Sequence, residues 1–199
     1  CDKDGIDVIC TNVVNLLNIP VEAIEMDFPI RVKTFHLRNG SGGAGEYRGG
    51  LGFERVFEVM RGEISATYRG ERHYSQPWGL FGGLPASKGR AIVIRKSGEE
   101  EVIPSKRDAI LYEGDQLHMA VPGGGGYGDP LTRKAELVLQ DVLNRKVSLE
   151  AAVEDYGVVI DRESLSIDRG KTEELRGGRK RARDSITWTY DRGPEWGKE

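Results

Sequence analysis

Residues 39–52 read NGSGGAGEYRGGLG, and half of them are glycine. Glycine loses more backbone entropy on ordering than any other residue and offers no side chain for packing, so this stretch is neither a helix nor a regular strand. Two further clusters follow, WGLFGG at 78–83 and PGGGGYG at 122–128, each behind a segment of β character. Repeated glycine predicts positive φ angles, tight turns or a close approach by other backbone. We therefore expect the three clusters to converge on one surface, which is a substrate site or a subunit interface.

The chain around these clusters has a β pattern. Six short segments carry β-branched and aromatic residues and are bounded by glycine, proline, asparagine or aspartate. Residues 96–99 (KSGE) have the composition of a hairpin turn. We therefore predict an α+β fold that is mostly antiparallel β, sandwich or barrel-like, with glycine-rich loops, two short helices and an extended tail. The predicted strands span residues 30–37, 53–60, 63–69, 90–96, 100–104 and 116–121.

After the third glycine cluster the spacing of apolar residues changes to that of a helix. Asp129 followed by proline is a favourable helix start, and it predicts a helix of about 12 residues. Ser148 can cap a second short helix over residues 149–156, which Gly157 ends. Residues 158–160 (VVI) then form a strand or a buried extension.

The composition divides the chain into three parts. Residues 1–29 are rich in Asp, Asn and Pro and are interpreted as an irregular segment that continues from a missing N-terminal region, with one short helical turn over 21–26. Residues 30–160 form the β-rich domain with its helices, and residues 161–199 form a charged tail. The basic cluster at 176–183 is a solvated or partner-bound segment; a nucleic-acid patch is the weaker alternative, because acidic residues flank it and no aromatic residues are interleaved.

The bulk composition excludes several classes of protein. The 199 residues are 38% hydrophobic and 31% charged, as in a soluble globular protein, and the net charge of -3 gives no general argument for nucleic-acid binding. No apolar stretch approaches the roughly 20 residues of a spanning helix, so no membrane association is expected. Two cysteines, Cys1 and Cys10, cannot form a disulfide framework, and we expect a cytoplasmic location. The initial cysteine indicates a fragment or a processed chain; a nucleophile freed by self-cleavage is the alternative.

Several side chains could carry chemistry, each with a structural alternative. His36, His73 and His118 lack metal-ligand spacing and are interpreted as structural. Residues 121–130 could form an anion-binding nest, but they lack the lysine of a P-loop. Arginines beside the glycine clusters (Arg48, Arg69, Arg72) could clamp an anion, or they could pair with Glu46 or Glu71.

The motifs become specific when they are taken in order. The chain reads TNVVNLLNIPVEAIE (11–25), SGGAGEYRGGLG (41–52), PWGLFGG (77–83), GDQLHMAVPGGGGYGDP (114–130) and YGVVI (156–160). This series closely resembles the C-terminal part of the hydantoinase B family, over roughly residues 6–160. The family includes the second subunit of ATP-dependent N-methylhydantoinases, the corresponding half of 5-oxoprolinases, and large subunits of acetone and acetophenone carboxylases.

The resemblance implies an enzyme that works as a cytoplasmic hetero-oligomer. A hydantoinase A-like partner would bind ATP and Mg²⁺, and this chain would join the N-terminal part of its own subunit to act on a small carbonyl or cyclic-amide substrate. Hydrolysis of a hydantoin or 5-oxoproline-type ring is the first expectation. Carboxylation of a ketone and a non-catalytic assembly role are the alternatives. The chain alone is expected to be inactive.

The resemblance also implies a set of site residues. A divalent metal is expected in the missing N-terminal region, so no metal ligand is assigned here. Where the family motif has aspartate before its Ser-Gly-Gly-Ala-Gly, this chain has Gly40, so the role of that aspartate has no counterpart. Glu22 and Glu25 would share one face of a helical turn, or would simply be exposed polar residues. The implied catalytic residues are Asn12, Asn15, Glu22 and Glu25, and the implied substrate-binding residues are Ser41, Gly42, Gly43, Arg48, Gly123, Gly124, Gly125 and Gly126.

Overall fold

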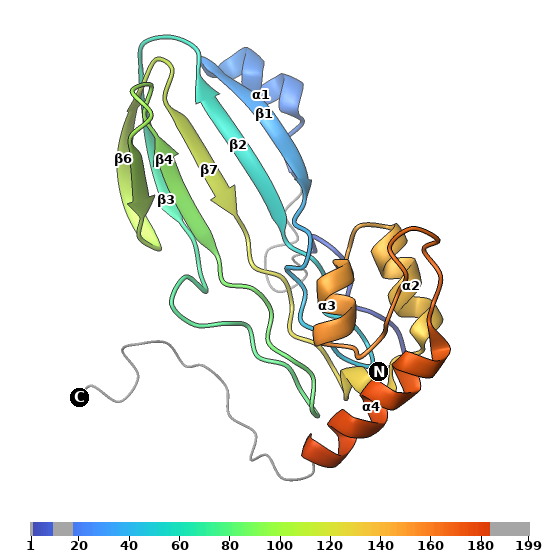
Figure 1. Cartoon of the computed structure of the whole chain (residues 1–199). Helices are drawn as coiled ribbons and strands as arrows, with labels where there is room; N and C mark the ends of the chain where they lie inside the picture. The colour runs from blue at the N-terminus through green and yellow to red at the C-terminus, as the bar shows by residue number, and fades with distance from the viewer. Residues whose placement is uncertain (1, 10–17, 184–199) are drawn as a thin grey trace, which may run out of the picture.

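The computed structural model describes residues 2–9 and 18–183, and its main element is a five-stranded antiparallel sheet (Figure 1). The strand order is β1-β2-β7-β4-β5, and a separate two-stranded antiparallel sheet, β3-β6, packs against one face of it. This arrangement confirms the predicted, mostly antiparallel fold. The strands are β1 (Ile30–Leu37), β2 (Phe53–Val59), β3 (Glu63–Arg69), β4 (Arg90–Ile94), β5 (Glu100–Ile103), β6 (Lys106–Tyr112) and β7 (Gln116–Ala120).

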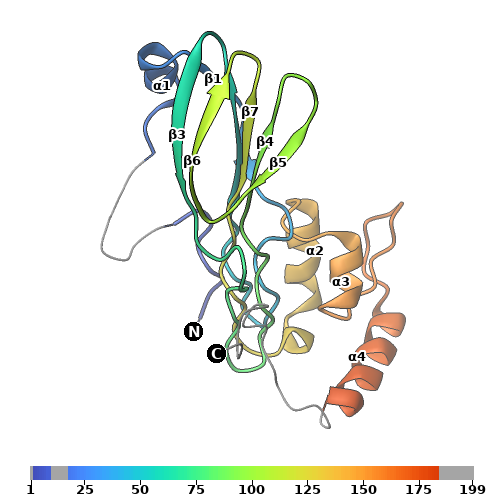
Figure 2. The same ribbon diagram turned by 90° about the vertical axis from the view of Figure 1, so that its left-hand side faces the viewer.

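The first hydrophobic core lies between the five-stranded sheet and the two-stranded β3-β6 sheet. Alternate residues of the central strands point inward, because successive side chains of a strand face opposite sides. We call the face of the five-stranded sheet that meets the β3-β6 sheet its inner face. Figure 2 shows β3 and β6 lying in front of this face. The buried residues of this core are Val59, Ala91, Val93, Ile103, Ala109, Leu111 and Leu117.

Strand β6 was absent from the sequence prediction. Its first three residues are charged and exposed, and only Ala109 and Leu111 are buried against the sheet. A strand of a two-stranded sheet needs few apolar residues, which is why composition alone did not identify β6. The predicted hairpin turn does connect β4 to β5, with Gly98 at a φ of 88°.

A second hydrophobic core lies under the C-terminal helices. It is built from α2 (Ala135–Leu143), α3 (Leu149–Glu154) and the buried residues Tyr156 and Val158. The Asp129 side chain accepts a hydrogen bond from the Leu131 amide, as expected for a cap, but it caps only the 3₁₀ turn Pro130–Thr132. The backbone then extends at Arg133 (ψ 134°), so the predicted helix is divided and α2 is nine residues long.

The prediction of an extended tail after residue 160 is wrong for residues 169–183. They form helix α4 (Arg169–Arg183), which packs beside α3 (Figure 1). Arg176 donates hydrogen bonds to the carbonyls of Tyr156 and Arg133, and Arg179 donates to those of Val153 and Glu154 at the end of α3. Polar contacts to helix-end carbonyls, rather than an apolar stripe, hold this helix, and composition does not reveal such contacts. No helix within the described residues is long and apolar enough to cross a membrane.

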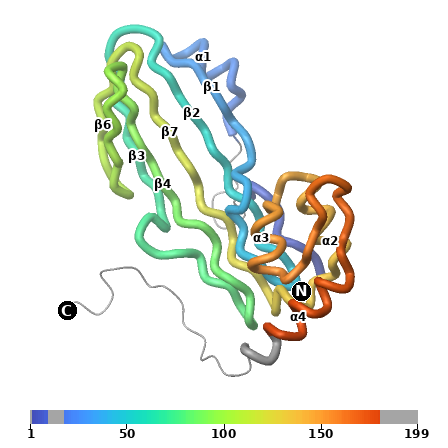
Figure 3. Tube along the Cα trace, in the orientation of Figure 1, coloured from blue at the N-terminus to red at the C-terminus, as the bar shows by residue number. Residues whose placement is uncertain are grey.

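The three glycine clusters meet between the two cores in what we call the glycine layer, residues 41–52, 77–86 and 122–128. Their backbones are joined directly: the Gly43 amide donates to Gly124 O (2.9 Å), the Gly124 amide to Gly50 O (2.8 Å) and the Gly126 amide to Leu84 O (2.9 Å). Figure 3 follows these segments below the sheet. Two extended chains this close leave no room for side chains between them, so glycine is required at the crossings.

Close approach, and not a positive φ, explains most of these glycines. A Cβ added at Gly49 would lie 1.8 Å from Gly124 O, and one added at Gly125 would lie 1.9 Å from Trp78 O. Positive φ angles occur at the margins of the layer, at Gly40, Gly82 and Gly128, and at none of residues 123–126.

We predict that Gly125→Ala and Gly124→Ala have very different effects. The added methyl group of Gly125→Ala collides with backbone that cannot rotate away, so the free energy of unfolding should fall by about 1–3 kcal/mol or more. A Cβ at Gly124 meets nothing closer than 3.5 Å, so Gly124→Ala should change stability by less than about 1 kcal/mol. Urea denaturation measures both, and equal stability of the two variants would contradict the role of close backbone contact.

Candidate functional site

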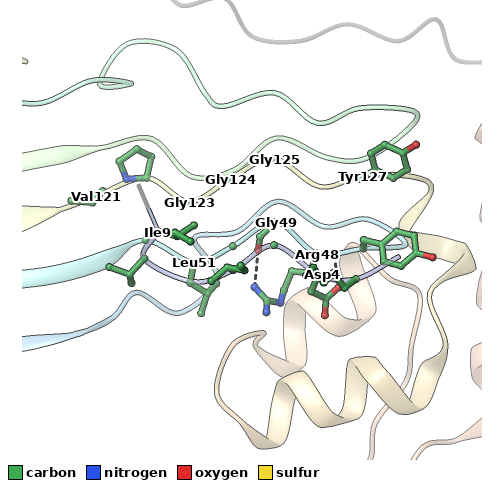
Figure 4. Close-up of a pocket in the computed structure, with 18 of the residues that line it drawn as sticks. Asp4, Ile9, Arg48, Gly49, Leu51, Val121, Gly123, Gly124, Gly125 and Tyr127 are labelled. Carbon is green, nitrogen blue, oxygen red and sulfur yellow. Dashed lines mark hydrogen bonds between the residues drawn. The ribbon is translucent and has the colours of Figure 1, made fainter. Parts of the chain in front are cut away.

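A hollow of about 750 Å³ lies between the glycine layer and the N-terminal segment, residues 2–9 (Figure 4). Its apolar end is formed by Ile9, Leu51, Phe53 and Val121. Its other end carries Asp4, Arg48 and Tyr127. A concave, mostly apolar site with a few polar groups at one end is the usual form of a small-molecule site. We call it the glycine-lined hollow.

Backbone amides in the lining are available as hydrogen-bond donors. The amides of Gly124 and Gly126 are used within the glycine layer, whereas those of Gly123 and Gly125 donate to no acceptor in the described part of the chain. Gly123, Gly124 and Gly125 all line the hollow. Both glycines are half-buried, so these amides can donate to solvent or to a ligand in the hollow.

Carboxylates hold the N-terminal segment against the hollow. Asp4 forms two hydrogen bonds with the Arg133 guanidinium (2.6 and 2.8 Å) and accepts another from the Arg48 amide (2.8 Å). Asp7 accepts from the Leu51 amide (2.9 Å) and from Lys146 Nζ (2.8 Å). One wall of the hollow is therefore attached through charged groups to the region of the C-terminal helices.

These contacts set the pKa values of the two carboxyl groups. Burial raises the pKa of Asp4, but the hydrogen bond and charge of Arg133 outweigh it and lower the pKa below its ordinary value of 3.8. Burial likewise raises the pKa of Asp7, and the Leu51 amide with Lys146 and Arg48 brings it below 3.8. Both groups are carboxylates at neutral pH.

Arg48 has its contacts inside the protein. Only 2% of its side chain is exposed. Its Nη1 lies 3.4 Å from Asp7 Oδ1, and its Nε lies 3.5 Å from Asp141 Oδ1. Of the two interpretations of this arginine, the ion pair agrees with these contacts, although its partners are not the glutamates expected from the sequence. Three buried donors beside the network (Arg48 Nε, Arg133 Nε and Tyr156 Oη) have no hydrogen-bond partner among the described residues.

The other implied substrate-binding residues lie within the glycine layer. Ser41 is fully buried; its hydroxyl donates to Arg38 O (2.7 Å) and accepts from the Gly52 amide (2.9 Å). Gly42 and Gly43 contact backbone, and Gly126 does the same beside Ala44. Among the implied substrate-binding residues, the hollow is lined by Arg48 and the three glycines at 123–125.

Of the implied catalytic residues, the two glutamates are not brought to the hollow. Glu22 and Glu25 lie on helix α1 (Val21–Asp27), beside the opposite end of β1 from the glycine layer (Figure 1). Glu25 accepts a hydrogen bond from the Val32 amide (2.8 Å). Asn12 and Asn15 lie outside the described residues.

The histidines are separated, and the described residues contain no group of three His, Cys, Asp or Glu side chains that could hold a metal ion. His73 shares a hydrogen bond with Tyr68 Oη (2.9 Å), and His118 with Gln116 (3.0 Å). Burial lowers the pKa of both imidazoles. Neither of these two side chains lines the hollow.

Sequence reasoning missed the residues that hold the site together. Asp4 meets Arg133 across 129 residues of sequence, Asp7 meets Lys146 across 139, and Arg133 also binds Asp141. The only available signal was the density of aspartate at the start of the chain, and aspartate there fits a solvated segment equally well.

Comparison with known proteins gives consistent results. Residues 1–130 match the family described as Hydantoinase B/oxoprolinase. A putative D-/L-hydantoinase subunit from Pseudomonas sp. is 36% identical over 177 residues, which are 87% of this chain and 29% of that protein. The crystal structure of ATP-dependent caprolactamase from Pseudomonas jessenii has a TM-score of 0.71 at 29% identity, over 79% of this chain and 28% of that chain.

A third comparison extends the fold to another reaction. The nucleotide-free structure of acetone carboxylase, described in terms of ATP-dependent acetone carboxylation, has a TM-score of 0.72 at 23% identity and covers 85% of this chain and 27% of that chain. At this identity the likeness concerns the fold alone. The chain spans less than a third of the length of these relatives.

We predict that acid weakens the fold through Asp4 and Asp7. A carboxyl group whose pKa is lowered by folding stabilises the protein above its unfolded pKa near 3.8, and that stability is lost as the pH falls through the lowered pKa. The free energy of unfolding should therefore be steady near neutral pH and fall below about pH 4.

Asp4→Asn tests this assignment. It should lower stability at pH 7 by about 1–3 kcal/mol, because Arg133 loses a partly buried carboxylate, and it should flatten the acid limb of the profile. Asp2→Asn, an exposed change on the same segment, is the control and should leave both unchanged. Matching profiles for the two variants would show that Asp4 does not anchor the segment.

Proposed function

The chain belongs to the hydantoinase B/oxoprolinase family, and we propose that it works within a subunit of an ATP-dependent complex that acts on a carbonyl or cyclic-amide substrate. The names of its relatives support this proposal: one is a putative hydantoinase subunit, and another is an ATP-dependent caprolactamase. Because the chain spans less than a third of those proteins, we assign the activity to the assembly and not to this chain alone.

The glycine-lined hollow is the observation that carries the proposal. Phosphorylation turns the amide oxygen into part of a leaving group, and negative charge gathers on that oxygen as its bond to the carbonyl carbon breaks. Preoriented donors stabilise such charge, and removing one typically costs about 10²–10³ in rate where the site is dry. We assign this role to the unpaired amides of Gly123 and Gly125.

Ring hydrolysis is the reaction we favour over ketone carboxylation. The hollow of about 750 Å³ has an apolar end made of aliphatic and aromatic side chains, which suits a substituted ring better than a small ketone. Sequence identity does not separate the two reactions, because the hydantoinase subunit is 36% identical, the caprolactamase 29% and an acetone carboxylase alpha subunit 30%, so the preference rests on the hollow. A hydantoin, lactam or 5-oxoproline-type ring is therefore the proposed substrate class. Ketone carboxylation and a purely structural role in the assembly are the alternatives.

We assign nucleotide binding to a hydantoinase A-like partner subunit. The sequence has no P-loop lysine after its glycine clusters, and the described residues offer no cluster of carboxylates suited to Mg²⁺. These residues do not fit a Mg²⁺–ATP site, so we derive no step through one. The contribution of this chain is to bind and orient the carbonyl.

We predict that the isolated chain turns over neither ATP nor a cyclic amide. Purified chain is mixed with ATP and a hydantoin, a lactam or 5-oxoproline, and product is measured. In the assembled complex, photolabelling with azido-ATP should modify the partner subunit. Label mainly on this chain, or turnover by the chain alone, would overturn the division of labour.

A second prediction addresses the hollow directly. Ile9 lines its apolar end and is 52% exposed, so Ile9→Trp should fill substrate space without disturbing a core. In the complex this variant should raise KM for a bulky 5-substituted hydantoin by about tenfold or more, while the ATP affinity stays unchanged.

Met26→Trp is the matched control, because Met26 is 86% exposed on helix α1 and does not line the hollow. Equal kinetics of wild type, Ile9→Trp and Met26→Trp would exclude the hollow as the substrate site. Glu22→Gln in the same assay tests the catalytic role that the family resemblance implies for that glutamate.

A further inference from the structure

Arg55 of strand β2 is a buried cation surrounded by aromatic rings. Its guanidinium lies 3.9 Å from the ring centre of Phe35, 5.5 Å from that of Phe53 and 5.6 Å from that of Phe57. In the sheet register it stands beside Phe35 on β1 and Met119 on β7, so it lies on the inner face. Only 8% of the residue is exposed.

This cation has no anionic partner in the described part of the chain. Its one hydrogen bond goes to Asn18 Oδ1 (3.2 Å), and its Nε has no partner. The sequence of residues 10–17, CTNVVNLL, contains no acidic residue, whereas residues 184–199, also outside the described part, contain four; the stability of the chain alone tests whether one of these pairs with Arg55. Burial alone is the cause that lowers the pKa of Arg55, with no opposing effect from a nearby carboxylate. Stacking on aromatic rings offsets only a part of the cost of removing a charge from water.

Other buried or half-buried arginines of the chain are paired differently. Arg133 has Asp4 and Asp141 within 2.8 Å, and Arg95 has Glu101 and Asp115 within 2.9 Å. Arg55 therefore differs from Arg133 and Arg95, each of which has two carboxylate partners. A buried charge without a counter-charge is a reason to look for one outside the chain.

The surface around Arg55 is apolar, and the described residues leave it uncovered. Strand β1 is at the edge of the five-stranded sheet, and none of its residues belongs to the buried core beneath the β3-β6 sheet (Figure 2). Phe35 and Leu37 on β1 are 41% and 40% exposed, and Ile19, next to Asn18, is 63% exposed. Helix α1 packs beside the start of β1, where Glu25 binds Val32, and does not extend to this end of the strand.

We propose that this end of β1, with Phe35, Leu37 and Arg55, is the docking surface for a polypeptide segment that this chain does not contain. The segment places an Asp or Glu carboxylate against the Arg55 guanidinium and apolar side chains against Phe35 and Leu37. An edge strand with an exposed apolar row favours a polypeptide, because such a strand offers its backbone as well as its side chains. The inference rests on the proposed function only for the existence of an assembly, and it is tested separately from catalysis.

The first test measures the thermal stability of the chain alone. Arg55→Met removes an uncompensated charge while keeping apolar volume, so Tm should stay level or rise, by up to ~2–4 °C. Arg95→Met is the matched control, because it leaves the buried Asp115 without its cation and removes one of the two arginines that bind Glu101, so it should lower Tm by a similar amount or more. A clear fall in Tm for Arg55→Met would show that the chain itself compensates this charge, and would overturn the proposal.

The second test uses the assembled complex. Arg55→Met should weaken assembly by about 30-fold, as expected for a central anchor residue, and Arg55→Lys should retain part of the affinity. A photo-crosslinking residue at Leu37 should label a peptide that carries an Asp or Glu, and replacing that acid by Arg should restore assembly to Arg55→Glu.

The other outcomes overturn the proposal. A crosslink to a second copy of this chain would make the surface a homodimer interface. If millimolar phenylacetate, added without any peptide, blocked crosslinking by the residue at position 37, the surface would be a site for a small-molecule carboxylate. Unchanged affinity for Arg55→Met would show that the surface takes no part in assembly. Because none of these readouts measures turnover, they remain informative if the proposed reaction is wrong.

Discussion

Direct contact between glycine backbones is the constraint on which the rest of the structure depends. At Gly49 and Gly125 the neighbouring carbonyl oxygens occupy the place where a Cβ would be. This closeness lets three segments, far apart in sequence, exchange hydrogen bonds without any strand ladder between them. The glycine layer in turn lies between the core beneath the β3-β6 sheet and the core beneath the helices, and it connects the two. The entropy that glycine loses on ordering is the cost of this arrangement.

Close packing of backbone also determines what the site can do. Where the chain is extended and every second amide is used inside the glycine layer, the intervening amides of Gly123 and Gly125 stay available beside the hollow. Rigid donors need no reorganisation when charge develops on a bound oxygen, which is the property an activated carbonyl requires. A loop of ordinary residues could offer the same groups, but side chains would keep its neighbours apart and the donors less fixed. The proposed role of these amides thus rests on the same packing arrangement that requires the glycines.

Buried charges are treated in two ways, and the difference has a physical meaning. Around the hollow, Arg48 and Arg133 lie between Asp4, Asp7 and Asp141, so that positive and negative groups compensate one another and attach the N-terminal segment. On β2, Arg55 has rings around it but no acid among the described residues. Paired charges of the first kind specify how one part of the chain sits on another, because removing either partner leaves the other uncompensated. The second kind leaves the compensation to something else, which is why we connect it with assembly.

The sequence by itself determined the local features: six of the seven described strands from their β-branched and aromatic residues and the turn residues that bound them, the caps at Asp129 and Ser148, and the need for glycine at 41–52 and 122–128. These depend on neighbours within a few residues, so pattern and propensity suffice to predict them. Only the tertiary structure decided which reason applied to each glycine, that α4 is a helix, and that Arg48 is paired with aspartates. It also placed Glu22 and Glu25 beside β1, away from the hollow. These outcomes depend on groups that are far apart in the sequence, such as Asp4 and Arg133, which are 129 residues apart. No local pattern encodes which distant partner a charge or a backbone carbonyl will find.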